Sequence, residues 1–230
     1  MKANRSVSTK SAGDQALPPQ EFRELLEPEL RNAFRPYWVG PKGYWCLCCG
    51  YICETVNKLR RSSAEDYNRQ YRESKVECDK ALAKKDFFEF VFLHDWTHQV
   101  EALKGLMLRL PAAQYGRLVR RVWTESDDVL WTSMLEWTDL FLSLSEVSRR
   151  QFMTQQDQKV FDALPEKFHV YRGYYPNLNE GGMSWSLDRE IAVGYGPKDA
   201  RVRSKTIQKS DVLGYTNARN DKEIILQAEG

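Results

Sequence analysis

Apolar residues recur at helical spacing through the first two thirds of the chain. From Phe22 to Phe34 they suit one face of a helix, which Pro28 interrupts or restarts. The same spacing predicts further helical segments over 54–85, 94–110, 112–122 and 127–144, and over a short stretch ahead of Pro165. The chain up to residue 165 is therefore expected to be mainly α-helical.

Capping and turn-forming residues mark the ends of several segments. Thr154, with Asp157 three residues later, has the pattern of an N-terminal capping box, and Ser126 or Asp127 is expected to cap the helix that follows it. Between residues 36 and 45, prolines and glycines separate aromatic residues, so this stretch is expected to be an ordered loop.

After Pro165 the pattern changes to short β-prone runs separated by Gly, Asn and Asp. These runs are 168–172, 183–187, 201–208, 212–216 and 223–227. One helix interrupts them, beginning at the N-cap Asp188 and ending at Gly196-Pro197. Helices followed by strands indicate an α+β fold, in which the helices lie against one side of the sheet.

Composition and charge narrow the class of protein. The chain is 42% hydrophobic and 12% aromatic, which is typical of a globular protein. Thirty-four basic and 32 acidic side chains leave a net charge of +2, too small for a broad nucleic-acid-binding field. No apolar run approaches the ~18 residues of a membrane helix, and no secretory signal is legible. Neither nucleic acid nor a membrane is an expected partner.

Three regions follow from these patterns. Residues 1–20 have the composition of a disordered lead-in. Residues 21–165 form the mainly helical region, which contains a Cys- and Trp-rich loop, and residues 166–230 form the β-rich portion.

Five cysteines, four of them within eight residues, do not resemble the evenly spread framework of a disulfide-stapled secreted domain. We expect buried free thiols in a reducing cytoplasm. A zinc site remains an alternative, because Cys46 and Cys49 have CxxC spacing while His94 and His98 lie one turn apart on a predicted helix. The long separation of the two pairs is not that of a zinc finger, so no metal site is predicted.

Polar motifs stand at the ends of the predicted strands, where a rigid scaffold often places functional groups. Arg172 ends one strand beside Gly173, so its guanidinium can bind a phosphate while the glycine lets a ligand approach closely. Ser184 and Ser186 alternate along the next strand and face the same side.

Asp221 and Glu223 alternate in the same way and present two carboxylates together. Each motif also has a structural interpretation. The arginine can form a salt bridge, the serines can face solvent, and the carboxylates can protect a sheet edge.

The order of these motifs resembles the R-S-E group of mono-ADP-ribosyltransferases. An arginine strand is followed by Ser-x-Ser leading into a helix, and then by an acidic-x-Glu leading into a strand, over about residues 168–228. The resemblance implies a C-terminal split β-sheet core that binds NAD as a substrate. It also implies transfer of ADP-ribose from NAD to a partner macromolecule, for which a protein is the expected target.

Residue roles carry over by position. By resemblance, Arg172 contacts the dinucleotide's phosphate or ribose, the serine motif of Ser184 and Ser186 supports the nicotinamide ribose, and Glu223 stabilises the oxocarbenium ion. The backbone of Gly173 would contact the carboxamide.

The neighbouring Tyr174 or Tyr175 would stack on the nicotinamide ring, although loop packing is the simpler interpretation. Asp221 stands where the family has Glu or Gln and would orient the acceptor. The chain departs from the family in that Arg172 and Ser184 are only twelve residues apart, which leaves no room for the helix that many members place between them.

Segments 122–126 and 135–137 are also similar to uncharacterised phage and prophage proteins with the same strand motifs. This similarity implies a phage-encoded protein acting in a host cytoplasm. Two alternatives stay open: an NAD glycohydrolase, and a catalytically silent protein that keeps the fold and uses its aromatic helices to bind and inhibit a host protein.

Overall fold

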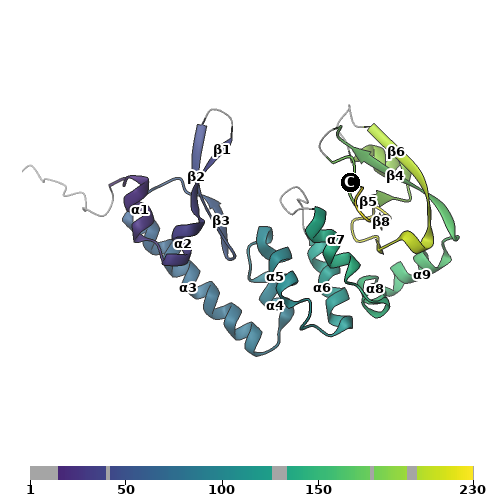
Figure 1. The fold of residues 1–230 in the computed structure, drawn as a ribbon, viewed down its shortest axis with the longest axis horizontal. Helices are drawn as coiled ribbons and strands as arrows, with labels where there is room; N and C mark the ends of the chain where they lie inside the picture. Colours follow the sequence, from purple (N-terminus) through teal and green to yellow (C-terminus); the bar gives the residue numbers. More distant parts are fainter. Residues whose placement is uncertain (1–14, 40–41, 126–133, 177–178, 196–200, 230) are drawn as a thin grey trace, which may run out of the picture. The chain divides into compact units, whose positions relative to one another are not determined.

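The computed structural model describes residues 15–39, 42–125, 134–176, 179–195 and 201–229. The chain divides after Gln99 into two compact units, each described by itself below. Helices and two antiparallel sheets make the fold α+β, as predicted (Figure 1). Among the described residues, no helix combines the length and apolar character needed to cross a membrane.

The first unit packs helices around a three-stranded sheet of order β1-β2-β3. Its predicted first helix is divided at Pro28, and the long helix α3 packs along α1 (Figure 1). Phe22, Leu30 and Leu47 are fully buried in its core. The elements are α1 (Pro19–Leu25), α2 (Pro28–Ala33), β1 (Phe34–Val39), β2 (Lys42–Cys49), β3 (Ile52–Thr55), α3 (Arg61–Ala83) and α4 (Phe87–Phe92), with a 3₁₀ turn (Trp96–His98).

The loop predicted over residues 36–45 is wrong, because most of this stretch belongs to β1 and β2. Aromatic residues favour strands, and the Phe34 and Trp45 rings stack with their centroids 4.8 Å apart. Pro36 is tolerated because β1 is an edge strand. The predicted lead-in ends close to Pro19, where α1 begins; residues 1–14 lie outside the described part.

The prediction of free thiols is wrong for two cysteines. Cys48 and Cys53 are directly opposite each other in the β2–β3 ladder and form a disulfide. Cys46, Cys49 and Cys78 are free, and only Cys78 is buried. The β2–β3 pair that brings these two cysteines together is not visible in the cysteine spacing. The spacing therefore gives no argument for a reducing compartment.

The histidines do not share a helix. His94 lies in the break after α4, where its Nδ1 is 2.8 Å from the Phe90 carbonyl and 4.0 Å from Cys78 Sγ. His98 ends the 3₁₀ turn, and the helix predicted from residue 94 begins instead at Gln99. In the described part of the chain, no three His, Cys, Asp or Glu residues are grouped to hold a metal.

The second unit combines helices with a five-stranded antiparallel sheet of order β6-β4-β5-β8-β7 (Figure 1). All five predicted strands are present. The helices before Pro165 belong to this same unit rather than to a separate helical region, since α8 and α9 pack against β7. The helices are α5 (Gln99–Leu106), α6 (Ala112–Glu125), α7 (Met134–Leu142), α8 (Glu146–Phe152), α9 (Gln155–Ala163) and α10 (Arg189–Gly194).

The strands of this unit are β4 (Lys167–Tyr174), β5 (Ser184–Ser186), β6 (Arg201–Gln208), β7 (Gly214–Thr216) and β8 (Glu223–Ile225), with a 3₁₀ turn (Lys209–Asp211). The predicted capping box of Thr154 and Asp157 and the predicted N-cap Asp188 are confirmed. The predicted cap at Ser126 or Asp127 and the predicted helix end at Gly196-Pro197 lie outside the described residues.

Candidate active site

A cavity of about 330 Å³ lies in the second unit, where β4 and β5 pair only through Tyr171 and Ser186. The sequence motifs on β4, β5 and β8 all reach it. Its lining residues come from these strands, from α6, α7 and α10 and from the connecting loops: Trp123, Met134, Tyr171, Arg172, Gly173, Tyr175, Asn179, Met183, Ser184, Trp185, Ser186, Ala192, Tyr195, Arg219, Asp221 and Glu223.

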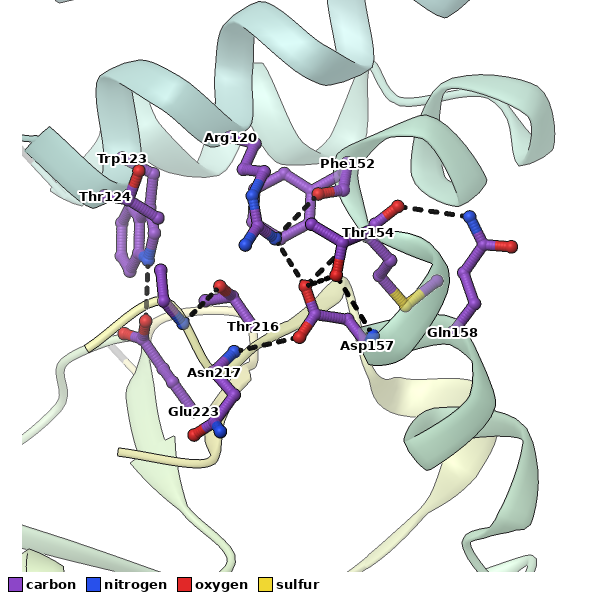
Figure 2. A network of polar contacts seen from close by, with 12 residues as sticks. Arg120, Trp123, Thr124, Phe152, Thr154, Asp157, Gln158, Thr216, Asn217 and Glu223 are labelled. Atoms are coloured by element: carbon purple, nitrogen blue, oxygen red, sulfur yellow. Dashed lines mark hydrogen bonds and ion pairs between the residues drawn. The ribbon is translucent and has the colours of Figure 1, made fainter. Parts of the chain in front are cut away.

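Glu223, the first residue of β8, is only 6% exposed and lies opposite Ser186. Its Oε2 accepts the indole N–H of Trp123 at 3.0 Å (Figure 2), and the Ser184 side chain favours the ionised form of the same carboxylate. Burial raises the pKa of Glu223 above its usual range, with a smaller contribution from Asp221, while the two donors and the charge of Arg219 oppose the rise. The predicted pair of Ser184 and Glu223 therefore lines the same cavity.

Asp221 is equally buried, at 6% exposure. Its Oδ2 accepts the Tyr195 hydroxyl at 3.1 Å, whereas its Oδ1 has no partner among the described residues. Burial, followed by the nearby Asp221 charge, raises the pKa of Tyr195 to about 12, so this phenol remains a donor at neutral pH. The Asp221 carboxylate lines the cavity, and its Oδ1 is a buried acceptor without a described partner.

The backbone around Asp221 is held in an unusual conformation. Asn220 and Lys222 have φ values of 59° and 48°, in the left-handed region that costs non-glycine residues free energy. The Asn217 side chain accepts the Lys222 N–H at 2.9 Å, and the Lys222 ammonium pairs with Asp188 at 2.9 Å. These contacts fix the loop, so the two acidic side chains are presented in one geometry.

Arg172 is 8% exposed and is committed to the backbone. Its Nε and Nη2 donate to the Asn179 carbonyl at 3.2 and 2.7 Å, and its Nη1 donates to the Ser184 carbonyl. A Cβ at Gly182 would overlap the guanidinium, so a glycine is needed there. Arg172 therefore ties the segment 179–184 to β4, and burial lowers its pKa.

Two further predicted site residues, Ser186 and Gly173, have structural contacts in the second unit. Ser186 Oγ donates to the Asp221 carbonyl at 2.7 Å and accepts the Asp188 N–H at 3.0 Å, so this hydroxyl joins β5 to the acidic loop. A Cβ at Gly173 would overlap the Ala192 carbonyl, so this glycine lets α10 approach β4.

The two tyrosines after Gly173 differ. Tyr174 is 7% exposed and is not among the described residues that line the cavity. Tyr175 is 38% exposed and lines the cavity.

Several site residues were missed by the sequence analysis. Trp123, interpreted as core packing, does pack edge-on against Trp137 with ring centroids 4.8 Å apart, but it also donates to Glu223. Arg219 and Tyr195 line the cavity as well. No local pattern marks Trp123, because its partner is 100 residues away in sequence.

One helix supports both the acidic loop and Glu223 (Figure 2). Arg120 and Trp123 lie one turn apart on α6, and Arg120 Nη1 forms an ion pair with Asp157 Oδ2 at 2.7 Å. Asp157 is 4% exposed; its Oδ2 also accepts the Thr154 hydroxyl at 2.7 Å, and its Oδ1 accepts the Asn217 N–H at 3.2 Å. The network therefore links α6 to the loop that carries Asp221.

Trp123→Phe tests the indole contact directly. The ring is kept but the N–H donor is lost, so the pKa of Glu223 is expected to rise further above its usual range. Carbon-13 NMR titration of the glutamate carboxyls, assigned with Glu223→Gln, measures this shift. Trp137→Phe is the control, since no described residue accepts its indole N–H; an equal shift in both variants, or none in Trp123→Phe, would contradict the assignment.

No protein-family model matches the sequence, and comparison with curated proteins and with solved structures gives no match either. The function of the cavity is therefore inferred from the residues that line it and from the distances between them.

Proposed function

We propose that the second unit is an NAD-dependent mono-ADP-ribosyltransferase of the R-S-E type, acting on a partner macromolecule. One observation carries the proposal. Arg172, Ser184 and Glu223 come from three neighbouring strands and all line one cavity, and the Ser184 side chain favours the ionised form of Glu223.

The reaction suits such a cavity. The bond between the ribose C1′ and the nicotinamide nitrogen breaks, and its electron pair leaves with nicotinamide, which was already cationic. No general acid is needed, because the leaving group departs as a neutral molecule. The requirement is a negative charge beside the oxocarbenium ion, held in a site of low dielectric.

Glu223 meets this requirement as a carboxylate. Burial alone favours its neutral acid, but the Trp123 and Ser184 donors and the Arg219 charge favour ionisation. These groups are in place before substrate binds, so little reorganisation accompanies the reaction.

The shape of the cavity also supports the proposal. Because β4 and β5 share a single residue pair, the five-stranded sheet approaches the split core that the resemblance implies. A volume of about 330 Å³ is at the lower end of the range for ligand sites and suits the nicotinamide-ribose end of the dinucleotide.

Asp221 is the candidate for the second step. Its carboxylate lines the cavity, so it can accept a hydrogen bond from the nucleophile that attacks C1′, and a base there can take the proton that the nucleophile releases. A water molecule in place of a macromolecular acceptor would give hydrolysis, so the two activities share this site.

Incubation of the protein with a cell lysate and NAD labelled in its adenylate group tests the proposal. The expected result is label on a macromolecule together with released nicotinamide. Label found only as free ADP-ribose would identify a glycohydrolase instead. Absence of both products would contradict the enzymatic proposal and favour a catalytically silent binding protein.

A further inference from the structure

Two of the described residues that line the cavity carry a positive charge, Arg172 and Arg219. NAD has two phosphates, and the one nearer the reacting bond must lie close to a site that already holds two carboxylates. Repulsion by Asp221 and Glu223 would weaken its binding unless a cation compensates. The question is which arginine does so.

Arg172 is poorly placed for this role. Three of its five N–H groups donate to main-chain carbonyls, and it is 8% exposed. Turning it toward a phosphate would release segment 179–184 and leave the Asn179 and Ser184 carbonyls without their donor.

Arg219, unlike Arg172, is exposed and has most of its N–H donors free of described partners. Its side chain is exposed, and its one hydrogen bond in the described structure runs from Nη2 to the Trp123 carbonyl at 2.8 Å. That bond anchors the guanidinium at the end of α6, beside the indole that holds Glu223. Nε, Nη1 and the second N–H of Nη2 remain, so the second Nη2 N–H can make a planar, two-point contact together with the N–H of Nε or of Nη1 on the same edge of the guanidinium.

The loop fixes where this guanidinium lies. Arg219 immediately precedes Asn220, whose φ of 59° is in the left-handed region, and the Asn220 N–H donates to the Asn217 carbonyl at 3.1 Å. Asn217 is in turn held by Asp157. The arginine is therefore positioned by the same network that positions the acidic pair.

We propose that Arg219, rather than the motif arginine Arg172, binds the phosphate next to the nicotinamide ribose. This assignment rests on the proposed function, since it concerns the same substrate in the same cavity. Arg172 then acts as a positioning residue that keeps β5 and Ser184 in place.

Isothermal titration calorimetry with two probes that differ by one phosphate tests the assignment. The probes are nicotinamide riboside and nicotinamide mononucleotide, and the full chain carries Glu223→Gln so that neither is consumed. The mononucleotide is expected to bind about 10- to 100-fold more tightly than the riboside, as for a charge-assisted hydrogen-bonded pair.

Adding Arg219→Gln is expected to remove this difference while leaving riboside affinity unchanged. Unchanged riboside binding shows that the cavity is intact, so a loss confined to the mononucleotide belongs to the phosphate contact. The control Arg150→Gln removes an equal charge from the same unit at an exposed pair with Asp162, and is expected to change neither affinity.

The other outcomes overturn the assignment. If Arg219→Gln weakens both probes equally, Arg219 only maintains the cavity; if it weakens neither, another group binds the phosphate. If the Glu223→Gln protein with Arg219 intact binds neither probe, the proposed function itself fails, which distinguishes that failure from the first two.

Discussion

Glu223→Gln is expected to slow nicotinamide release from NAD by about 10³-fold, the order of loss seen when a preorganised electrostatic contact is removed. Glutamine has the shape of glutamate but no charge to place beside the oxocarbenium ion. Its carbonyl can still accept the Trp123 N–H, and the Ser184 hydroxyl can rotate to accept from its amide. The site is thus kept while its charge is lost.

The same substitution is expected to stabilise the fold at neutral pH by about 1 kcal/mol, which raises the thermal midpoint by about 2–4 °C in a chain of this size. The pKa of Glu223 is raised on folding from its ordinary value of 4.5. Its contribution to stability is therefore full below pH 4.5 and is lost as the pH rises through the folded pKa. Glutamine does not ionise, so the variant loses no stability as the pH rises. The difference in stability between the variant and the wild type therefore grows from pH 4.5 through the folded pKa of Glu223.

The activity of the wild type is expected to change with pH in the opposite direction to the stability that Glu223 contributes. It requires the carboxylate, so nicotinamide release is expected to rise with pH through the folded pKa of Glu223. Thermal denaturation and nicotinamide release, measured at the same pH values, check both slopes. Glu166→Gln, at an exposed position, is the control and should change neither quantity. A Glu223→Gln protein that is fully active would refute the assigned role.

Asp157→Ala is expected to have the largest effect on stability, a loss of about 3–5 kcal/mol in the free energy of unfolding. The carboxylate is 4% exposed and pairs with Arg120 at 2.7 Å, so its removal leaves a half-buried guanidinium without its partner. The Thr154 cap and the Asn217 N–H also lose their acceptor. Chemical denaturation followed by tryptophan fluorescence measures the change.

The chain provides a matched control for this prediction. Asp162 also pairs with an arginine, Arg150, at 2.8 Å, but both side chains are about half exposed. Asp162→Ala is expected to cost less than about 1 kcal/mol. Equal losses in the two variants would show that the buried network has no special importance.

The strands of the second unit were predictable because their alternation is local. Ser184 and Ser186 lie on the strand β5, and the acidic motif leads into the strand β8. Alternate residues of a strand face the same side, so the pattern indicated which side chains would face a common site. The resemblance supplied the grouping of the three strands. The geometry then shows where the grouping is tight, at Ser184 and Glu223, and where a residue serves the backbone instead, at Arg172.

The sequence did not reveal the long-range contact between Trp123 and Glu223. Two local features were missed as well: the β1–β2 hairpin, because its prolines and glycines outweighed the strand preference of its aromatic residues, and the Cys48–Cys53 disulfide across the β2–β3 pair. Trp123 resembles any buried aromatic residue on an amphipathic helix. Only the packing of α6 against the acidic loop shows that its N–H is used at the site.

A crystal structure of the Glu223→Gln protein soaked with NAD tests the central claim most directly. The account predicts the nicotinamide ribose in the cavity between β4 and β5, with a ribose hydroxyl within hydrogen-bonding distance of residue 223 and of Ser184. Dinucleotide bound elsewhere, or a cavity that stays empty at saturating NAD, would contradict it.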